Sequence, residues 1–331
     1  MKFSPLYLSL ASAIGSSLLA TAAHAEPSPA PLELDTVSVS ADFRDSELQT
    51  IPASISVING TVIDQRTASH LEDVLAIIPN VNYASGASRG RYFQIRGIGE
   101  RSQFVAPLNP SVGTLVDGID FTGFGGAATL LDVEQVEVLR GSQGTRFGAN
   151  ALAGVINVKS VEPSSDSKGY IKFHSESYNG HGIEAAHGGA ISENLLYRAS
   201  IGKKVSDGYI ENTTLGDTYT NNIDELTSRL KLRWLATDDL TLNLSALYLN
   251  VDNGYDAFSL DENRKTRSDE PGHDRQKSVA LALDSNWKIS NAVSMETILT
   301  TNRTDADYGF DEDWTDPAFQ PGYQAFDNYK R

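Results

Sequence analysis

The chain has 331 residues, a formal net charge of −16 at pH 7 and no cysteine. That length predicts two or more domains, with ample chain to bury a core. The strong acidity argues against a nucleic-acid partner and against a basic membrane-surface anchor. The lack of cysteine excludes a disulfide framework, a thiolate metal site and a cysteine nucleophile.

The first residues are typical of an export signal, which we assign to residues 1–25. Lys2 is the lone basic residue of a short start, Tyr7–Ala20 is apolar but too short to span a bilayer, and Ala23–Ala25 supplies a small-x-small cleavage pattern. No later stretch approaches the length of a transmembrane helix. We therefore expect an exported protein that is periplasmic, secreted or an outer-membrane β-barrel.

A Pro-rich linker, residues 26–34, precedes the short β-favouring segment Asp35–Ala41, DTVSVSA. An isolated strand of this kind can pair with the sheet edge of another protein. It can equally be the first strand of the following domain. The residues alone leave both interpretations open.

Residues 42–162 have the pattern of a compact α/β unit. Ser54–Ile58 alternates like a strand and ends at Asn59-Gly60, which signals a turn. A helix follows, with Ser69 as its cap, Glu72 three residues later and Pro79 as its stop. Its apolar face comprises Leu71, Val74, Leu75 and Ile78. Further strands are expected at Val133–Leu139 and Val155–Lys159, and long Gly-rich loops at 85–90, 97–113 and 121–128 are expected to be functional or mobile.

Residues 163–331 change to long two-faced strands. Val279, Leu281 and Leu283, for example, alternate with small or polar residues. The connections expected on one side are short, whereas those on the other side are mostly long, which is the outer-membrane barrel pattern and not that of a soluble sandwich. The expected strands are 169–178, 182–190, 195–204, 225–236, 240–251, 275–288, 292–304 and one entered near 325. The short turns are near 191–194, 236–239 and 289–291, and the long connections are near 205–224, 252–274 and 305–324.

Eight strands enclose a lumen that only side chains fill, so a separate unit of this size needs a wider barrel. A barrel of 22 strands has a lumen that takes such a unit as a plug. We therefore expect an α/β plug inside an antiparallel transmembrane β-barrel, of which this chain holds the N-terminal part with about the first eight strands.

The order of these parts resembles the TonB-dependent outer-membrane receptors, and the resemblance covers nearly all of the chain. Two residues depart from the family's pattern, both in the last of the motifs given next: Ser142 stands where the family usually has proline, and Phe147 where tyrosine is common. Five motifs in the family's order carry the resemblance: DTVSVSA as the TonB box, IPASISVI with LEDVLAIIPNV as the plug opening, FQIRGIG as the central Ile-Arg-Gly motif, TLVDGID, and VEQVEVLRGSQGTRFGANALAGVINVKS.

The resemblance implies transport energised from the inner membrane through TonB, which pairs with the TonB box by strand addition. It also implies that Arg96 and Arg140 anchor the plug to barrel carboxylates, which we expect to lie beyond Arg331. The protein is expected in the outer-membrane lipid of a Gram-negative bacterium, as a monomer that binds TonB with its inner-membrane complex and a small-molecule ligand. The TonB-binding residues implied are Asp35, Thr36, Val37, Ser38, Val39, Ser40 and Ala41.

The plug's outward loops supply candidate ligand contacts. Arginines and aromatic rings at the floor of a pocket suit an anionic or aromatic metal chelate. Packing of these loops against the barrel wall is the alternative for each residue. By resemblance the candidates are Arg89, Arg91, Tyr92, Arg101, Gln103, Phe104, Phe121 and Phe124.

No catalytic constellation is present in the sequence, so we expect a transporter and not an enzyme, without a resident metal or prosthetic group. The Gly-rich segment Leu139–Ser160 lacks the Gly-Lys-Ser/Thr of a phosphate loop. Its glycines are expected to allow sharp turns and close strand packing. The acidic run Asp305–Asp316 is expected to be a solvated loop, with a calcium site as the alternative.

The leading hypothesis is active import of a scarce large solute, with a ferric siderophore as the transported ligand. Cobalamin, another cofactor and an oligosaccharide are the alternatives within the same transport class. A passive porin is disfavoured by the plug and the TonB box. A signal-transducing receptor is disfavoured because only residues 26–34 precede the box.

Overall fold

The computed structural model describes residues 38–39, 46–47, 54–85, 88–102, 109–124, 130–216, 220–255, 258–259, 261–316, 318 and 326–330. The predicted export signal, the linker and most of the predicted TonB box, residues 35–37 and 40–41, lie outside this range. Within it, the first elements are β1 (Ser38–Val39) and β2 (Ser46–Glu47).

The plug centres on a five-stranded sheet in the order β3-β8-β9-β6-β7. All neighbouring pairs are antiparallel except β9 and β6, which run parallel. A second, two-stranded sheet pairs β4 with β5. The strands are β3 (Ser54–Asn59), β4 (Val81–Ala84), β5 (Tyr92–Ile95), β6 (Val112–Val116), β7 (Ile119–Asp120), β8 (Val133–Arg140) and β9 (Gly154–Ser160), and the helices are α2 (Gly60–Gln65), α3 (Leu71–Leu75) and α4 (Gly144–Phe147).

Helix α3 has the predicted apolar face, but its cap differs from the prediction. Leu71, Val74 and Leu75 are fully buried in the hydrophobic core of the plug. The residue before the helix is His70, and Asp73 Oδ2 accepts the backbone N–H groups of Ser69 and His70 at 2.9 Å each. Asp73 serves here because its short carboxylate reaches the free N–H groups at the helix start.

The Asn59-Gly60 pair begins helix α2, so the predicted turn at this position is wrong. The Asn59 side chain accepts the Val62 N–H at 3.0 Å, which caps the helix. Asparagine is among the preferred N-cap residues because its side-chain oxygen satisfies a free N–H group of the first turn. The side chain of Asn59 therefore caps a helix and does not form the predicted turn.

In the Gly-rich segment Leu139–Ser160, Gly154 has a specific packing reason. Its φ is +153°, and a Cβ built there would lie 2.3 Å from the Leu139 carbonyl oxygen and 2.7 Å from Ile95 Cδ1. Only glycine lets β9 approach β8 this closely. Gly141 and Gly148 have φ of +99° and +84°, which fits the predicted sharp turns after β8.

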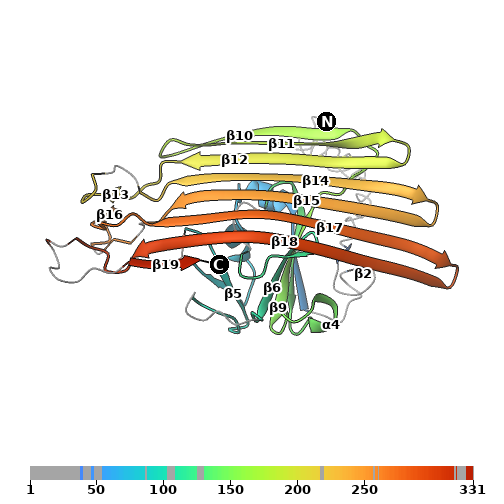
Figure 1. Cartoon of the computed structure of the whole chain (residues 1–331), viewed down its shortest axis with the longest axis horizontal. Coiled ribbons are helices and arrows are strands. Elements are labelled where there is room, and N and C mark those ends of the chain that lie inside the picture. Colours follow the sequence, from blue (N-terminus) through green and yellow to red (C-terminus); the bar gives the residue numbers. More distant parts are fainter. Residues whose placement is uncertain are drawn as a thin grey trace, which may run out of the picture. The chain divides into compact units, whose positions relative to one another are not determined.

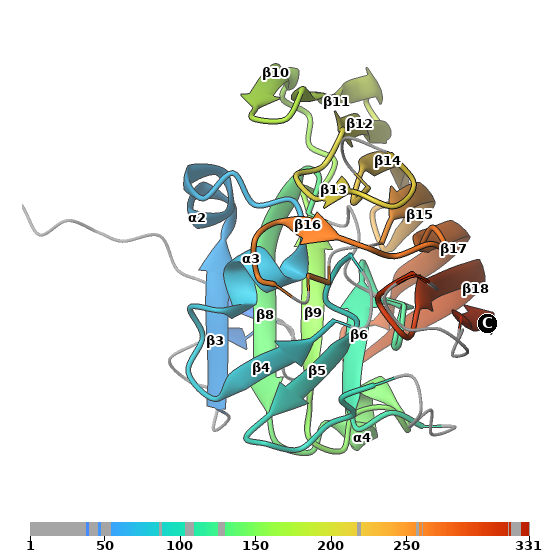
Figure 2. The ribbon, with the colours of Figure 1, turned by 90° about the vertical axis from the view of Figure 1, so that its left-hand side faces the viewer.

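The barrel part is an eight-stranded antiparallel sheet in the order β10-β11-β12-β14-β15-β17-β18-β19 (Figure 1). The predicted strands therefore form one sheet. The short turns 193–194, 238–239 and 291–292 lie at one end, and the long connections lie at the other end together with the tight turn 177–179. The predicted connection 305–324 begins later, because β18 continues to Asp311. Seen from the end with the long connections, the sheet curves around the plug (Figure 2). The strands are β10 (Lys168–Glu176), β11 (Gly180–Ser192), β12 (Leu195–Ser206), β14 (Ile223–Thr237), β15 (Leu240–Gly254), β17 (His273–Ser290), β18 (Val293–Asp311) and β19 (Phe326–Lys330), with β13 (Glu211–Asn212) and β16 (Lys265–Thr266) paired in the long connections.

The two faces of the barrel sheet differ as predicted. In β17, Ser278, Ala280 and Ala282 are buried toward the plug, while Leu281 and Leu283 are 43% and 39% exposed on the outer face. An apolar outer face opposite a polar or small-residue inner face is the pattern of a barrel wall in lipid. No helix in the described part of the chain is long and apolar enough to cross a membrane.

We expect Leu281→Arg to destabilise the folded barrel by about 2–4 kcal/mol at the centre of the apolar band, because it places a charge in lipid. Urea unfolding of the protein in lipid vesicles measures the change. Thr300→Arg is the matched control: Thr300 pairs with Ala282 and so lies on the inner face. Equal destabilisation by the two substitutions would contradict this assignment of the faces.

Candidate functional site at the plug and barrel interface

Among the described residues, fully buried charges lie where the plug meets the barrel wall. Arg89 and Arg91 precede β5 of the plug, and Asp274 is the second residue of β17. The Arg89 Nε donates to Asp274 Oδ2 at 3.0 Å, and Arg91 forms an ion pair with the same carboxylate. The Arg89 and Asp274 side chains are both fully buried. Gln276 and Ser88 complete the cluster by hydrogen bonds to Arg89 and Asp274.

A second cluster joins helix α3 to β14. The His70 Nε2 lies 2.8 and 3.0 Å from the two carboxylate oxygens of Glu225, whose side chain is 1% exposed. Burial lowers the pKa of His70, but the charge and hydrogen bond of Glu225, with the charges of Glu72 and Asp73, outweigh burial and raise the pKa to about 9. His70 is therefore a cation at neutral pH, and its pair with Glu225 is a buried salt bridge.

The two clusters are joined by one side chain. Asn253 Nδ2 donates to Glu225 Oε1 at 2.8 Å and to Ser88 Oγ at 3.1 Å, and Ser88 in turn donates to Asp274. The network thus runs from the plug helix through β14 and β15 to β17. Although the Arg91 Nε is buried without a hydrogen-bond partner, the bonds through Asn253 specify one arrangement of the groups that make them.

Two further contacts pair plug carboxylates with barrel cations. Asp117 faces Arg229 at 3.3 Å and Lys231 at 3.3 Å on β14, and although burial raises its pKa, these two cations outweigh burial and lower it. Asp132 accepts two bonds from the Arg198 guanidinium on β12, at 2.6 and 2.8 Å. A two-point guanidinium–carboxylate contact fixes orientation as well as distance.

Apolar packing adds to these pairs where the plug meets β15 and β17. Leu247 of β15 and Ala280 and Ala282 of β17 belong to the same hydrophobic cluster as the plug core. We call this contact the packed face. The plug core and the inner wall of the barrel therefore form one continuous apolar interior along β15 and β17.

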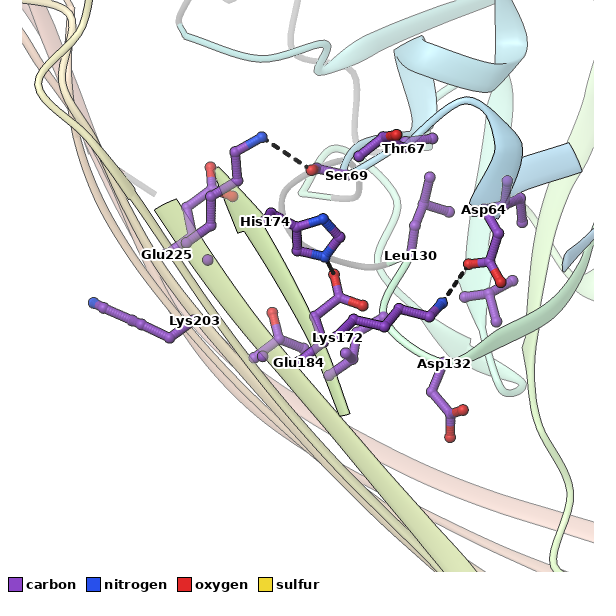
Figure 3. A pocket seen from close by; sticks show the side chains of 18 of the residues that line it. Asp64, Thr67, Ser69, Leu130, Asp132, Lys172, His174, Glu184, Lys203 and Glu225 are labelled. Atoms are coloured by element: carbon purple, nitrogen blue, oxygen red, sulfur yellow. Dashed lines mark hydrogen bonds and ion pairs between the residues drawn. The ribbon is translucent and has the colours of Figure 1, made fainter. Parts of the chain in front are cut away.

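On its other side the plug is separated from the wall by a cavity of about 360 Å³ (Figure 3). Plug residues 63–69 and 130–133 line one side, and inward residues of β10, β11, β12 and β14 line the other. We call this contact the open face. Two partly exposed contacts cross it: Lys172 Nζ lies 2.6 Å from Asp64 Oδ1, and Lys204 Nζ donates to Ser69 Oγ at 3.2 Å. The buried Asp132–Arg198 pair also crosses it, and Glu225 of the His70 pair lines it.

Aromatic side chains gather beside the Arg91 guanidinium, at the barrel end with the long connections. Tyr255 and Phe310 meet edge to face at 6.0 Å, and Tyr308 and Phe310 stack at 6.2 Å. The Arg91 guanidinium lies 4.9 Å from the centre of the Tyr308 ring. An inward-facing cluster of rings beside a guanidinium can stack on aromatic or conjugated solutes.

The two predicted anchors, Arg96 and Arg140, lie elsewhere on the plug. Arg96 is exposed, with a φ of +55°. Arg140 donates to the hydroxyl groups of Ser54 and Ser56 at 3.3 and 2.7 Å, both within the plug. Burial and the nearby charge of Arg96 lower the pKa of Arg140. Among the described residues, neither arginine contacts a barrel carboxylate, and their anchoring role stays a prediction.

The predicted ligand contacts fall into three groups. Arg89 and Arg91 are buried and paired with Asp274, and Phe121 is buried in the plug core. Tyr92 and Phe124 are half-buried, and Arg101 is exposed. Gln103 and Phe104 lie outside the described residues. In this arrangement Arg89 and Arg91 connect the plug to the wall, while contact of these residues with a solute stays untested.

The sequence did not indicate the barrel partners Asp274 and Glu225, or His70 on the plug. It did contain one pattern from which the two carboxylates could have been found. Asp274 and Glu225 each stand at an inward position of an alternating strand, where a charge must find a partner. This pattern predicts that the carboxylate needs a cationic partner, but it does not predict which residue the partner is, because the partners are 155 to 185 positions apart in the chain. Within the described residues no group of three or more His, Cys, Asp or Glu side chains could hold a metal ion.

A folded α/β plug seated by buried charges against the inner face of an antiparallel barrel wall defines a plugged β-barrel. Residues 47–155 match the family described as TonB-dependent Receptor Plug Domain. This match assigns residues 47–155 to the TonB-dependent receptor plug family, and the fold is that of a plugged barrel.

Three comparisons illustrate this placement. The pesticin receptor of Yersinia enterocolitica is 28% identical over 230 residues, which are 69% of this chain and 33% of that protein. The vitamin B12 transporter BtuB of Vibrio vulnificus is 32% identical over 139 residues, 40% of this chain and 21% of that protein. The ferric yersiniabactin uptake receptor FyuA from Yersinia pestis has the same fold, with a TM-score of 0.67 at 23% identity over 78% of this chain and 42% of that chain. The chain thus spans about a third of the length of the first curated relative.

We expect Asp274→Asn to weaken the seating of the plug by about 3–5 kcal/mol, because it leaves two buried guanidinium groups without their counter-charge. The urea concentration at which the plug becomes cleavable by a protease measures the effect. Asp252→Asn is the control, since the Asp252–Arg275 pair on the same strands is about 60% exposed and contributes about 0–1 kcal/mol. Similar shifts for both variants would refute the role of burial.

The seating of the plug should also depend on pH. The pKa of His70 is raised in the folded protein from its ordinary 6.5 to about 9. The stability that the His70–Glu225 pair contributes is therefore complete below about pH 6.5 and is lost as the pH rises through about 9. Protease susceptibility in urea, measured between pH 6 and 10, should show this loss in the native protein and a flatter profile in His70→Gln. Identical profiles would contradict the assignment.

Proposed function

We propose that this protein imports a scarce large solute, namely a ferric siderophore, across the outer membrane of a Gram-negative bacterium, with energy delivered through TonB. The observation that carries the proposal is the buried charge network between plug and wall. A passive pore has no use for a folded domain that is held in its lumen by fully buried ion pairs. Unseating such a domain costs several kcal/mol for each broken pair, so an external source of energy is implied.

The site for that energy is proposed at Asp35–Ala41. A short β-favouring segment can add to the edge of a partner's sheet, where main-chain hydrogen bonds give affinity. The Pro-rich composition of residues 26–34 suits a linker that lets the segment reach a partner protein. In this proposal TonB pairs with the segment and pulls on the plug.

A ferric siderophore is supported by the chemistry at the barrel end with the long connections. The half-buried rings of Tyr255 and Phe310, beside the buried Tyr308 and Arg91, offer stacking contacts to an aromatic metal chelate. FyuA, which shares the fold, is described as a ferric yersiniabactin uptake receptor. We propose Tyr92, Arg101, Gln103, Phe104 and Phe124 as further contacts of the solute.

Cobalamin is the second candidate solute. It is favoured by the 32% identity to the vitamin B12 transporter BtuB of Vibrio vulnificus, the highest identity among the relatives compared above. A corrin ring is also large, flat and conjugated, so the same aromatic cluster suits it. The transport mechanism is the same for both solutes.

Deletion of Asp35–Ala41 should abolish uptake and leave binding of the solute to the cell surface unchanged, because it removes only the segment that TonB would hold. Uptake of radioactive iron as ferric yersiniabactin or ferric enterobactin, and of radioactive cobalamin, measures the loss. Replacement of residues 26–34 by a Gly/Ser linker of equal length is the control and should retain uptake. Undiminished uptake after the deletion would contradict the proposed function.

A further inference from the structure

The acidic run Asp305–Asp316 contains two buried carboxylates where β18 ends. Asp311, Asp313 and Thr315 are 3%, 9% and 1% exposed, whereas Glu312 is exposed. The predicted solvated loop is therefore wrong for these two carboxylates. Both belong to the barrel end with the long connections, away from the contacts between plug and wall.

The two carboxylates have no counter-charge among the described residues. Their carboxyl groups lie against each other. Within the described part of the chain neither Asp311 nor Asp313 forms an ion pair, and a guanidinium of the preceding long connection, that of Arg267, pairs with Asp261. Two like charges that touch and are withdrawn from water repel, so a proton or a cation must lie between them.

Two oxygen atoms at this position, Asp313 Oδ2 and Thr315 Oγ1, are buried without a hydrogen-bond partner. The two residues are in contact, because the Thr315 N–H donates to Asp313 Oδ1 at 3.1 Å. A buried oxygen atom without a partner is unfavourable in a native protein, and a bound ion is one of its explanations. A proton shared by the carboxyl groups would leave the Thr315 hydroxyl group unpartnered, whereas a cation binds carboxylate and hydroxyl oxygens together.

Oxygen ligands of this kind suit Ca²⁺. This ion takes about six to eight oxygen atoms in flexible geometry, whereas Mg²⁺ demands near-ideal octahedral geometry and keeps much of its water. Two carboxylates supply the charge, and uncharged oxygens and water can complete the shell, so no third acidic side chain is required. A site with so few charges is weak, with a Kd on the order of 10⁻⁴–10⁻³ M, as in extracellular modules.

The same segment contacts two other long connections. Trp314 stacks on Phe258, in the connection before β17, with ring centres 4.1 Å apart. The Thr214 hydroxyl group, in the connection before β14, donates to Asp316 Oδ2 at 3.2 Å. A cation that fixes this segment therefore holds three connections together at this end of the barrel.

We propose that Asp311, Asp313 and Thr315 bind one divalent cation, Ca²⁺, which neutralises the two carboxylates and holds the long connections in one arrangement. The cation is a resident part of the protein and not its transported solute. Binding of this cation does not depend on the transport function.

Calorimetric titration with CaCl₂ tests the site in the full-length protein, purified in detergent and freed of metal by a chelator. The native protein should bind a single Ca²⁺, and MgCl₂ should bind at least about tenfold more weakly. Asp313→Asn should weaken Ca²⁺ binding about tenfold or more, because it removes a charge from the unpartnered oxygen. Glu312→Gln, the matched control, removes the same charge from an exposed neighbour and should change the affinity by less than about twofold.

Luminescence of Tb³⁺, which replaces Ca²⁺ among oxygen ligands, locates the ion without a change of ligand. Trp314 lies between two of the proposed ligands in the chain, so excitation of tryptophan should produce Tb³⁺ emission that CaCl₂ suppresses. Trp314→Phe should abolish this emission.

Absence of Ca²⁺ binding by the native protein would overturn the proposal and assign the neutralisation of the carboxylates to a shared proton. Equal weakening by Asp313→Asn and Glu312→Gln, or emission that survives Trp314→Phe, would overturn it as well, because the ion would then lie elsewhere. The native titration and the Trp314→Phe comparison decide the matter even where Asp313→Asn does not fold.

Discussion

The arrangement of this protein depends on the rule that a charge withdrawn from water must be met by an opposite charge. Asp274 is fully buried, and it is compatible with folding only because Arg89 and Arg91 reach it from the plug. The same requirement joins His70 to Glu225. These demands fix which strands the plug lies against and in what orientation. Apolar packing alone tolerates many orientations, since it is not directional.

The sequence predicted the plug and the barrel sheet better than the contacts between them. Alternation along strands such as β17 predicted both the barrel sheet and its outward face, because period-two patterns are local. The apolar face of α3 was equally local. Asn59-Gly60 was misassigned because asparagine caps helices as readily as it forms turns. The ion pairs of the site were beyond reach, since nothing near Arg89 in the chain indicates Asp274.

The plug contacts the barrel wall in two different ways. The packed face combines a shared apolar core with a fully buried ion pair, whereas a cavity lies between plug and wall on the open face. The buried Asp132–Arg198 pair crosses the open face as well. Charge pairing therefore holds the plug on both faces, and apolar packing adds to it along β15 and β17.

The bridging position of Asn253 affects how the plug separates from the barrel wall. Because its amide binds both Glu225 and Ser88, loss of either cluster removes a partner from the other. The free energies of contacts that share a residue in this way are not additive. Once one cluster has separated, the other has lost a hydrogen-bond partner and separates at a lower cost in free energy. Release of the packed face would then be an all-or-none event with a threshold. Small fluctuations would leave the barrel sealed, and only a sustained pull would exceed that threshold.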